Sequence, residues 1–439
     1  MAVAKHISEL IGNTPLLEIP KEVHGLKNIR MYAKLEMQNI VGSLKDRIAW
    51  NILKDDIQEI GKKRQQIVEL SSGNTAKALT IFAGMYGASF KTVTNRIKVP
   101  EQKDILMLLG AEIEELPGLS ECPDLTNPND PLTYIVKQIN AQPERYYHTD
   151  QYFNSKNQEA HYKGTGQEIL DDLGKAPDYF VVGLGTAGSS SGVTRRLREE
   201  NPNMVTVGIV ADKADFIPGI RTIDEMYEVG LFDPDNYKNI EVVNSQEAVD
   251  GSLELIRKVG LLAGPTSGST YQGALKYLQN IDKELTEEKS VVFIACDRVE
   301  TYISYFKKRR PELFHVKENE VFTITHGEVE DHYESISIDQ IDRYIEENNP
   351  LIIDMRGTLA FQLGSIHKKA INIPLSSFEE MLAQGLPFAK NQAVLLVCPV
   401  GSRTKKYSAI INMRGGKAVS LEGGISSWVH SGRKLIDLS

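Results

Sequence analysis

Cysteine and long apolar runs are scarce in this sequence, and each absence excludes a class of protein. The 439 residues include three cysteines, at positions 122, 296 and 398, too widely spaced for a disulfide framework or a paired zinc site. We therefore expect no metal site. No apolar run approaches the roughly 20 residues that cross a bilayer. The N-terminus lacks the basic and apolar succession of a secretory signal.

A surplus of basic residues is also missing. The 59 acidic residues outnumber the 50 lysines and arginines, which gives a formal net charge of -9. Such a chain offers no basic surface to nucleic acid or to an anionic membrane. We expect small-molecule chemistry in the cytoplasm, with neither nucleic acid nor a membrane as partner.

The order of apolar runs predicts more than one domain. A chain of 439 residues exceeds what one hydrophobic core usually supports. Between about residues 64 and 300, short β-branched runs alternate with amphipathic stretches, which is typical of a doubly wound α/β sheet with crossover helices. A basic, proline-containing stretch interrupts this pattern before it resumes. We predict a large domain over 1–305, a linker over 306–335 and a small α/β domain over 336–439.

Three small-residue segments carry the chemical signal, and the first contains a lysine. The segment GSLKDRIAW at 42–50 places Lys45 at the start of an amphipathic run. A helix N-terminus favours anions, so a lysine is poorly placed there for the helix dipole. A solvated side chain is the ordinary interpretation of one lysine. The alternative is a Schiff base with a cofactor aldehyde, which requires burial and neighbours that lower the pKa of the amine.

The second segment, ELSSGNTAKAL at 69–79, runs from a short strand through small polar residues into a helix. Backbone amides and hydroxyls at such a helix N-terminus suit a carboxylate or a phosphate. A plain strand-to-helix turn with a serine or asparagine cap explains the same residues.

The third segment, YFVVGLGTAGSSSGVTRRLREE at 179–200, predicts a strand, a phosphate-binding loop and a helix. Gly183, Gly185 and Gly188 also satisfy G-x-G-x-x-G, and Asp212 follows at a suitable distance, so a dinucleotide site is an alternative. The loop is mid-chain rather than at the first βα turn. Four hydroxyls fit a terminal monophosphate better: Thr186, Ser189, Ser190 and Ser191. No G-K-[ST] follows, which excludes a P-loop.

Together, five ordered motifs resemble one enzyme family. They are GNTPLL at 12–17, KLEMQNIVGSLKDR at 34–47, SSGNTA at 71–76, GLGTAGSSSG at 183–192 and GLLAGPTSGST at 260–270. In order and spacing they resemble the cysteine synthase and cystathionine β-synthase family of pyridoxal-phosphate enzymes, over roughly 5–305. The resemblance implies a two-subdomain body of pyridoxal-phosphate fold type II, which is tryptophan synthase β-like. It also implies a homodimer.

The resemblance assigns roles to residues of these motifs. Lys45 holds pyridoxal phosphate and then serves as catalytic base, Asn74 hydrogen-bonds the ring hydroxyl, and Thr266 faces the pyridine nitrogen. A neutral hydroxyl there makes the cofactor a weaker electron sink, which favours elimination. The implied phosphate ligands are Gly185, Thr186, Ala187, Gly188 and Ser189. The implied ligands of the substrate are Ser71, Ser72, Gly73, Thr75 and Gln151.

One further residue concerns the leaving group. In IPGIRTIDEMYEVGLFDP, Arg221 stands where many acetylserine-using relatives have glycine, and the pattern is similar to relatives that accept O-phosphoserine. A planar guanidinium suits phosphate, so Arg221 is a candidate for the leaving group, with a surface arginine as the alternative.

The C-terminal part resembles a single rhodanese domain. It contains LIIDMRGTLAFQLGSIHKKAINIPL, then LLVCPVGSRTKKYSAIINMRGG and VSLEGGISSW. Cys398 ends a strand and begins the loop CPVGSR, which also supplies Gly401 and Arg403. A cysteine at a helix N-terminus is typical of a reactive thiol that could carry a persulfide. Burial as a small hydrophobic residue is the ordinary alternative.

These patterns predict a cysteine synthase-like transferase. The large domain forms an aminoacrylate from O-acetylserine, O-phosphoserine or serine. Cys398 relays sulfane sulfur, and the expected sulfur source of the enzyme is sulfide, persulfide or thiosulfate. Three alternatives stay open. One is a lyase that eliminates cysteine or a thiocysteine derivative and passes the sulfur to Cys398. The others are a non-catalytic sulfur-sensing protein and a nicotinamide oxidoreductase.

Overall fold

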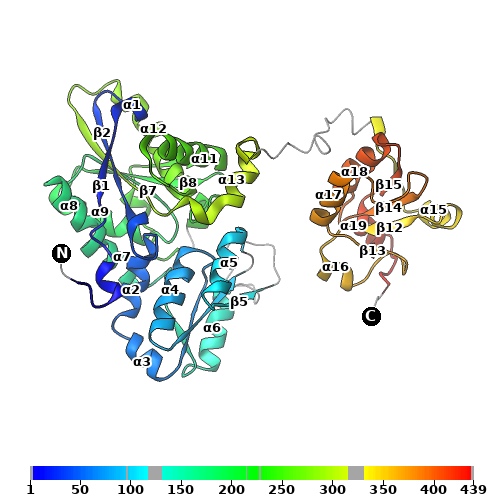
Figure 1. The fold of residues 1–439 in the computed structure, drawn as a ribbon, viewed down its shortest axis with the longest axis horizontal. Helices are drawn as coiled ribbons and strands as arrows, with labels where there is room; N and C mark the ends of the chain where they lie inside the picture. The colour runs from blue at the N-terminus through cyan, green and yellow to red at the C-terminus, as the bar shows by residue number, and fades with distance from the viewer. Residues whose placement is uncertain are drawn as a thin grey trace. The chain divides into compact units, whose positions relative to one another are not determined.

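A computed structural model describes residues 3–94, 97–116, 131–213, 215–226, 229–314 and 331–436. Cys122 lies outside these ranges. The chain divides into two compact units, Met1–Arg309 and Arg310–Ser439, which are described separately (Figure 1).

Two sheets form the large unit. The first has six strands in the order β1-β2-β10-β7-β8-β9, and all its neighbours are parallel except β1 and β2. The second has four parallel strands in the order β5-β4-β3-β6. The strands of the first sheet are β1 (Leu16–Ile19), β2 (Ile29–Lys34), β7 (Tyr179–Gly183), β8 (Val205–Ala211), β9 (Asn239–Val243) and β10 (Lys289–Ile294). Those of the second are β3 (Gln66–Glu69), β4 (Ser89–Thr94), β5 (Glu112–Glu115) and β6 (Tyr146–His148).

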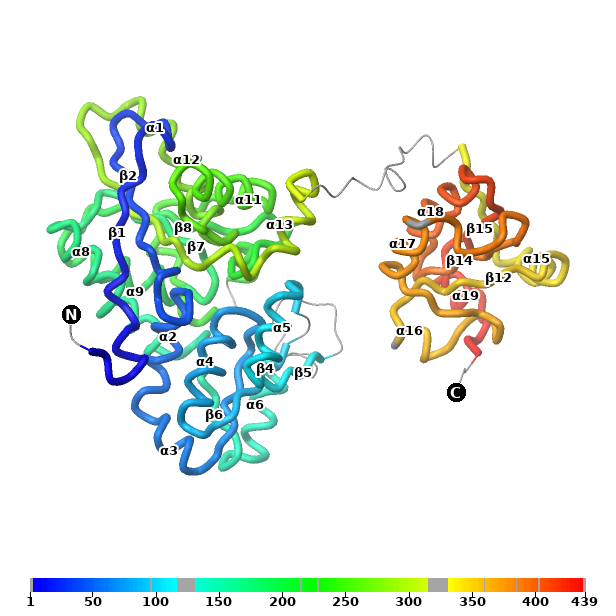
Figure 2. Tube along the Cα trace, viewed as in Figure 1, coloured from blue at the N-terminus to red at the C-terminus, as the bar shows by residue number. Residues whose placement is uncertain are grey.

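The chain enters the six-stranded sheet twice. Strand β2, near the N-terminus, pairs in parallel with β10, with Ile29 opposite Lys289 and Lys34 opposite Ile294. Between these visits the chain builds the four-stranded sheet and returns at β7, as the colour of the trace shows in Figure 2. Segments far apart in the sequence therefore meet at the carboxyl ends of the strands, where ligands of open α/β sheets bind.

Helices cover both faces of the six-stranded sheet because successive residues of a strand point to opposite sides. On β7, Val181 belongs to the core that includes Leu278 of α12, whereas Phe180 and Val182 belong to the core that includes Leu197 of α9. The longer helices of this unit are α2 (Lys45–Leu53), α3 (Ile57–Lys62), α4 (Asn74–Met85), α5 (Pro100–Leu108), α6 (Pro131–Ala141), α7 (Ser155–Ala160), α8 (Gln167–Leu173), α9 (Gly188–Glu200), α11 (Ser245–Glu254), α12 (Pro265–Asp282) and α13 (Ile303–Arg309). Two one-turn helices, α1 (Lys21–His24) and α10 (Ile223–Met226), complete the set. This is the doubly wound body that the sequence predicts.

The small unit repeats the scheme with one sheet. Its five parallel strands lie in the order β11-β15-β14-β12-β13. Leu395 and Leu396, adjacent on β14, point into two separate cores on opposite faces. The strands are β11 (Ser335–Ile336), β12 (Leu351–Asp354), β13 (Ile371–Asn372), β14 (Ala393–Val397) and β15 (Lys417–Leu421). The helices are α15 (Ile341–Asn348), α16 (Thr358–Gln362), α17 (Leu375–Gln384), α18 (Ser402–Met413) and α19 (Gly424–His430).

Both limits of the predicted linker, 306–335, fall inside regular structure. The first limit lies within α13, because Tyr305 and Phe306 are buried in a core with Tyr302 of the large unit. The second lies within β11, which pairs with β15. Apolar residues that belong to the last helix of a core are hard to tell from a linker when charged residues follow them directly. No helix among the described residues is long and apolar enough to cross a membrane.

Candidate active site

Lys45 is the first residue of α2, and the end of β10 positions it. The backbone N–H of Leu44 donates to the carbonyl of Cys296 at 3.0 Å, and that of Lys45 donates to Ser43 Oγ at 3.2 Å. The Lys45 ammonium makes no hydrogen bond or ion pair with any described residue. Burial lowers its pKa, which the charge of Asp297 partly offsets. A lysine in this state has a larger fraction of free amine than a solvated one.

The loop before Lys45 is pinned by a buried carboxylate. Asp46 accepts the backbone N–H of Val41 at 2.6 Å and the hydroxyl of Ser43 at 3.2 Å. Its burial raises the pKa of the carboxyl to about 6, although these hydrogen bonds and the charge of Lys77 act in the opposite direction. The Lys77 ammonium lies 3.7 Å from the position that a Cβ on Gly42 would take. This half-buried lysine therefore borders the loop that carries Lys45.

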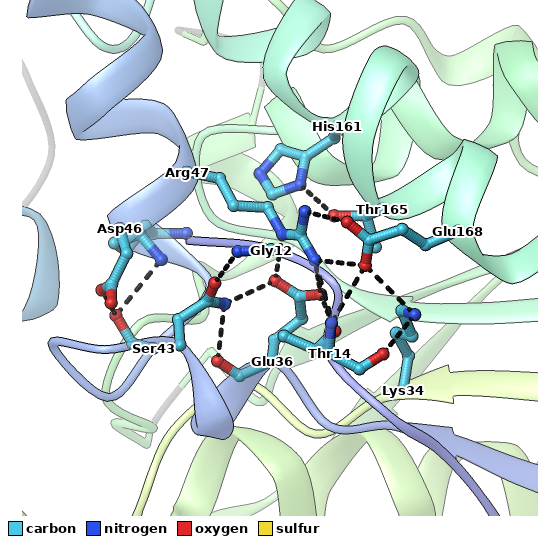
Figure 3. Close-up of polar contacts among 12 residues, drawn as sticks. Gly12, Thr14, Lys34, Glu36, Ser43, Asp46, Arg47, His161, Thr165 and Glu168 are labelled. Atoms are coloured by element: carbon cyan, nitrogen blue, oxygen red, sulfur yellow. Dashed lines mark hydrogen bonds and ion pairs between the residues drawn. The ribbon is translucent and has the colours of Figure 1, made fainter. Parts of the chain in front are cut away.

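A network of buried charges fixes the body of α2 (Figure 3). Arg47, two residues after Lys45, donates through Nε and Nη2 to the carboxylate of Glu36 at 2.6 and 2.7 Å. Nη1 and Nη2 also donate to Glu168, each at 2.7 Å. The Glu36 side chain is fully buried, and Thr14 and Arg47 both donate to it. The N-terminal loop, η2 (Glu36–Gln38), α2 and α8 are thereby joined at one point.

The same network continues to the edge of the unit. Lys34 is fully buried and contacts Glu168 at 3.2 Å and Asp172 at 2.9 Å. Hydrogen bonds and charge from Arg47 hold the pKa of Glu168 at about 2, against its burial. Charged groups this far from water remain ionised only when each has a partner.

Asn74 is the first residue of α4, and its side chain is turned away from the helix backbone. Gly73 is the N-cap, and no side chain caps this helix end. Asn74 Nδ2 donates to Asp297 Oδ2 at 2.6 Å and lies 3.3 Å from the hydroxyl of Tyr302. The hydroxyl of Tyr302 also donates to Asp297 Oδ2. Within the preceding loop, Ser71 Oγ accepts the backbone N–H of Ala76 at 3.2 Å.

Asp297 and Tyr302 are functional candidates that the sequence motifs did not single out. Asp297 is 2% exposed and lies three residues after Ile294, the last residue of β10, so it stands near the carboxyl end of a parallel strand. Its place just after an apolar strand was the one feature of the sequence that could have identified Asp297 as a functional candidate. Burial raises the pKa of Asp297, and its hydrogen bonds with Tyr302 and Asn74 oppose the change.

The predicted phosphate loop has the backbone of an anion site. Ala187 adopts the left-handed conformation, with φ of 59°, and α9 begins at Gly188. A Cβ on Gly188 would lie 1.9 Å from Asn157 Oδ1, and one on Gly185 would lie 2.7 Å from the carbonyl of Gly219. Glycine is therefore required at both positions. Backbone N–H groups at the start of this 13-residue helix are free to face a phosphate.

Two hydroxyls expected in this loop are directed elsewhere. Ser190 Oγ donates to the carbonyl of Ala187 at 3.0 Å and bonds to the Tyr237 hydroxyl, and Ser191 Oγ donates to the carbonyl of Leu231 at 3.0 Å. Both serines are buried, and their hydroxyls are bonded to the interior partners Tyr237 and Leu231. Ser189 remains half-exposed.

Thr266, in the first turn of α12, lies beside the loop that follows β8. Its hydroxyl donates to the carbonyl of Pro218 at 2.5 Å and lies 3.2 Å from the Cβ position of Gly219. Contact with a pyridine nitrogen would require this hydroxyl to rotate. Gly219 in turn borders Gly185, so Thr266 and the phosphate loop share one wall.

Gln151 links the start of α4 to the phosphate loop. Its side chain accepts the Thr75 hydroxyl at 3.0 Å and donates to the carbonyl of Leu70 at 2.9 Å. Its own carbonyl accepts Nδ2 of Asn157, which also donates to Thr186 Oγ1 at 3.0 Å. The chain of contacts runs from the start of α4 to the phosphate loop. Gln151 is 3% exposed, and both ends of its side-chain amide are already bonded. It therefore joins the two loops.

Arg221 stands next to the phosphate loop through its backbone. Its N–H donates to the carbonyl of Leu184 at 2.8 Å, and its guanidinium lies over the ring of Tyr152, 5.1 Å from the centroid. The structure thus brings Arg221 to the same wall as Gly185. Ser72 and Gly73 remain half-exposed in the loop before α4, where a substrate carboxylate can reach them.

The residues present fit the cofactor that the resemblance implies. Lys45 offers an unpaired amine, the start of α9 offers backbone N–H groups, and Asn74 offers a polar amide. The hydrogen bonds described above link all three segments into one site.

In the small unit, Cys398 lies between β14 and α18. It is 1% exposed, and its Sγ lies 3.5 Å from Thr404 Oγ1. Gly401 has φ of 78° and is the N-cap of α18, and its carbonyl accepts the Thr404 hydroxyl at 3.0 Å. A Cβ on Gly424 would lie 2.1 Å from the carbonyl of Cys398. Arg403 is exposed. The Cys398 thiol is therefore buried beside Thr404, at the start of α18.

Comparison with family models assigns the large unit and the small unit to different families. Residues 7–297 match the pyridoxal-phosphate dependent enzyme family, and residues 337–431 match the rhodanese-like domain. Cysteine synthase B of Pseudomonas aeruginosa is 30% identical over 302 residues, which cover 68% of this chain and 95% of that protein.

Solved structures agree. A hydrogen sulfide-producing enzyme from Fusobacterium nucleatum matches with a TM-score of 0.60 and 27% identity, covering 69% of this chain and 99% of that one. An O-acetylserine dependent cystathionine β-synthase from Helicobacter pylori matches with a TM-score of 0.58 and 25% identity, covering 69% and 98%. The predicted fold type II body, the rhodanese-like domain and the cofactor are thereby confirmed.

Proposed function

Because the chain belongs to the family of pyridoxal-phosphate dependent enzymes and ends in a rhodanese-like domain, we propose that it replaces the β-substituent of a serine-like amino acid with sulfur. One observation carries this proposal. A continuous set of hydrogen bonds joins the backbone that carries Lys45, the amide of Asn74 and the phosphate loop. When bound, pyridoxal phosphate supplies the electron sink that stabilises negative charge at the α-carbon.

The proton transfers fall to Lys45. Its amine removes the proton from the α-carbon, and the β-leaving group departs with its bonding electrons. A sulfur nucleophile then adds to the β-carbon, and the Lys45 ammonium returns the proton to the α-carbon. The lowered pKa of Lys45 supports the first of these steps, because it increases the fraction of free amine near neutral pH.

The substrate is O-acetylserine, O-phosphoserine or serine. Its carboxylate is held at the start of α4 by the loop of Ser71, Ser72, Gly73 and Thr75, where helix N–H groups favour an anion. Gln151 supports this loop from beneath. Arg221 is proposed to bind the leaving group, and its place beside the phosphate loop supports a phosphate-bearing substrate.

The small domain supplies the sulfur. The Cys398 thiolate attacks the outer sulfur of thiosulfate or a persulfide, an S–S bond breaks, and sulfite or a thiol leaves. A low-molecular-weight thiol takes the outer sulfur from the Cys398 persulfide, and a second thiol reduces that species to hydrogen sulfide and a disulfide. The sulfide is the nucleophile for the β-carbon. Gly401 and Arg403 shape the loop and its rim, as in the rhodanese-like pattern.

A lyase is the second candidate. The match to a hydrogen sulfide-producing enzyme favours this candidate. A lyase would use the same site of the large domain to break a carbon–sulfur bond instead of forming one. Elimination from cysteine releases sulfide, pyruvate and ammonia. We also propose a homodimer located in the cytoplasm, as expected from the family resemblance.

The test uses the full chain loaded with cofactor. Formation of cysteine is measured with each of the three serine derivatives and sulfide. Lys45→Ala is expected to abolish turnover, whereas Lys63→Ala, at the exposed lysine that directly follows α3, leaves it unchanged. Turnover by Lys45→Ala equal to that of the wild type would refute the assignment. Pyruvate and ammonia formed from cysteine, with no cysteine made from the serine derivatives, would establish the lyase instead.

A further inference from the structure

We infer that Asp297 is a positioning residue for the cofactor site, which acts by holding the Asn74 amide in one orientation. The inference rests on the proposed function, because it concerns how the chain meets the cofactor ring. Asp297 and Asn74 are 223 residues apart in the sequence, and they are joined by a hydrogen bond of 2.6 Å in a buried place.

The hydrogen bond between Asn74 and Asp297 determines which N–H of the Asn74 amide remains available for the cofactor. Asp297 Oδ2 and the Tyr302 hydroxyl are bonded to each other, so both lie on the same side of Asn74 Nδ2. The two N–H bonds of a planar amide diverge by about 120°, so one of them serves both partners. The second N–H is left over. It is a donor with a fixed direction, as a negatively polarised ring oxygen requires.

Without Asp297, the amide would keep only its contact with the Tyr302 hydroxyl, which can donate or accept and so does not select one orientation. The Asn74 side chain does not cap α4, and its hydrogen bonds are those with Asp297 and Tyr302. An asparagine amide can flip so that its oxygen and nitrogen exchange places. A carboxylate accepts and cannot donate when ionised, so Asp297 selects the orientation in which nitrogen faces it.

Asp297 is itself held firmly. Its carbonyl accepts the N–H of Gly264 at 2.9 Å, and it forms a backbone bridge with Ser43, two residues before Lys45. A Cβ on Gly264 would lie 2.3 Å from Asp297 Oδ1. One carboxylate oxygen thus faces Asn74 and Tyr302, and the other is packed against Gly264. Oδ1 has no hydrogen-bond partner among the described residues, so the contact by which Asp297 bears on the site is the one through Asn74.

The experiment is a double-mutant cycle on cofactor binding. Apo-protein is titrated with pyridoxal phosphate, and the dissociation constant and the visible absorbance maximum of the bound cofactor are measured. The variants are Asn74→Ala, Asp297→Ala and the double variant. We expect each single variant to weaken binding about five- to tenfold, which corresponds to one hydrogen bond, and to shift the absorbance maximum in the same direction. The double variant should be no weaker than Asn74→Ala alone.

Two further variants separate positioning from loss of fold. Asp297→Asn keeps the shape and can still accept from Asn74, so it should bind the cofactor more tightly than Asp297→Ala. Asp282→Asn is the matched control, because this carboxylate is also buried and accepts the backbone N–H groups of Lys27 and Asn28, at the opposite ends of the strands. It should leave both cofactor readouts unchanged.

The outcomes distinguish this inference from the proposed function. If the wild type binds cofactor and Asp297→Ala binds it equally well with the same absorbance maximum, the inference is wrong. Effects of Asn74→Ala and Asp297→Ala that multiply in the double variant would also overturn it. Failure of the wild type to bind cofactor would overturn the proposed function, and the inference with it.

Discussion

Replacement of Arg47 by methionine is expected to destabilise the large unit by about 3–5 kcal/mol, the cost of leaving a buried charge without its partner. Most of this cost falls on Glu36, whose side chain is fully buried and receives two hydrogen bonds from Arg47, of 2.6 and 2.7 Å. Glu168 is less affected because 17% of its side chain is exposed and Lys34 remains beside it. Methionine keeps the length of the aliphatic stem, so little of the loss comes from packing.

Two matched variants test the reasoning. Lys63→Met removes an ion pair with Glu59 in which both side chains are more than half exposed, and it should cost about 0.5 kcal/mol or less. The combination of Arg47→Met with Glu36→Gln should be less unstable than Arg47→Met alone, because the stranded charge is gone.

Tryptophan fluorescence can follow the large unit alone. The chain has two tryptophans: Trp50 lies on α2 of the large unit, 5.5 Å from the ring of Phe82, and Trp428 lies in the small unit. In a Trp428→Phe background, urea unfolding monitored at Trp50 gives the free energy for the large unit. A loss below about 1 kcal/mol for Arg47→Met would refute the argument, since it would mean that Glu36 finds water or a proton at little cost.

Three further predictions concern other sites. The pKa of Glu168 is about 2 in the folded chain, below its ordinary value of 4.5, so its contribution to stability is complete above pH 4.5 and is lost as the pH falls towards 2. Glu168→Gln should flatten the pH dependence of unfolding in that window, and an unchanged profile would contradict this. Gly188→Ala places a methyl 1.9 Å from Asn157 Oδ1 and should weaken cofactor binding measured by fluorescence titration. Gly84→Ala, the control, meets no atom within 4 Å and should instead raise the free energy of unfolding by about 1 kcal/mol. Cys398→Ser should abolish thiocyanate formation from thiosulfate and cyanide but leave sulfide-dependent turnover intact; loss of both would contradict a separate role for the small domain.

Local signals in the sequence predicted much of the architecture. Alternating β-branched runs indicate strands because successive side chains face opposite cores, as those of β7 and β14 do. Glycine positions were also informative, since Gly185 and Gly188 stand where a Cβ would meet neighbouring atoms. The boundaries were less certain. Charged residues after α13 concealed that its aromatic side chains belong to the core.

The sequence by itself determined the two-domain plan, the position of Lys45 at a helix start and the glycine loop of the phosphate site, because each depends on residues close together in the chain. The tertiary structure alone decided which distant groups become partners. Asp297 reaches Asn74 because β10 lies between β2 and β7, so the carboxyl end of a late strand meets the start of an early helix. Likewise, Arg47 of α2 pairs with Glu168 of α8, which lies 121 residues further along the chain. Periodicity and motifs report local geometry, whereas hydrogen-bond partners between segments depend on the order of strands, which no local pattern contains.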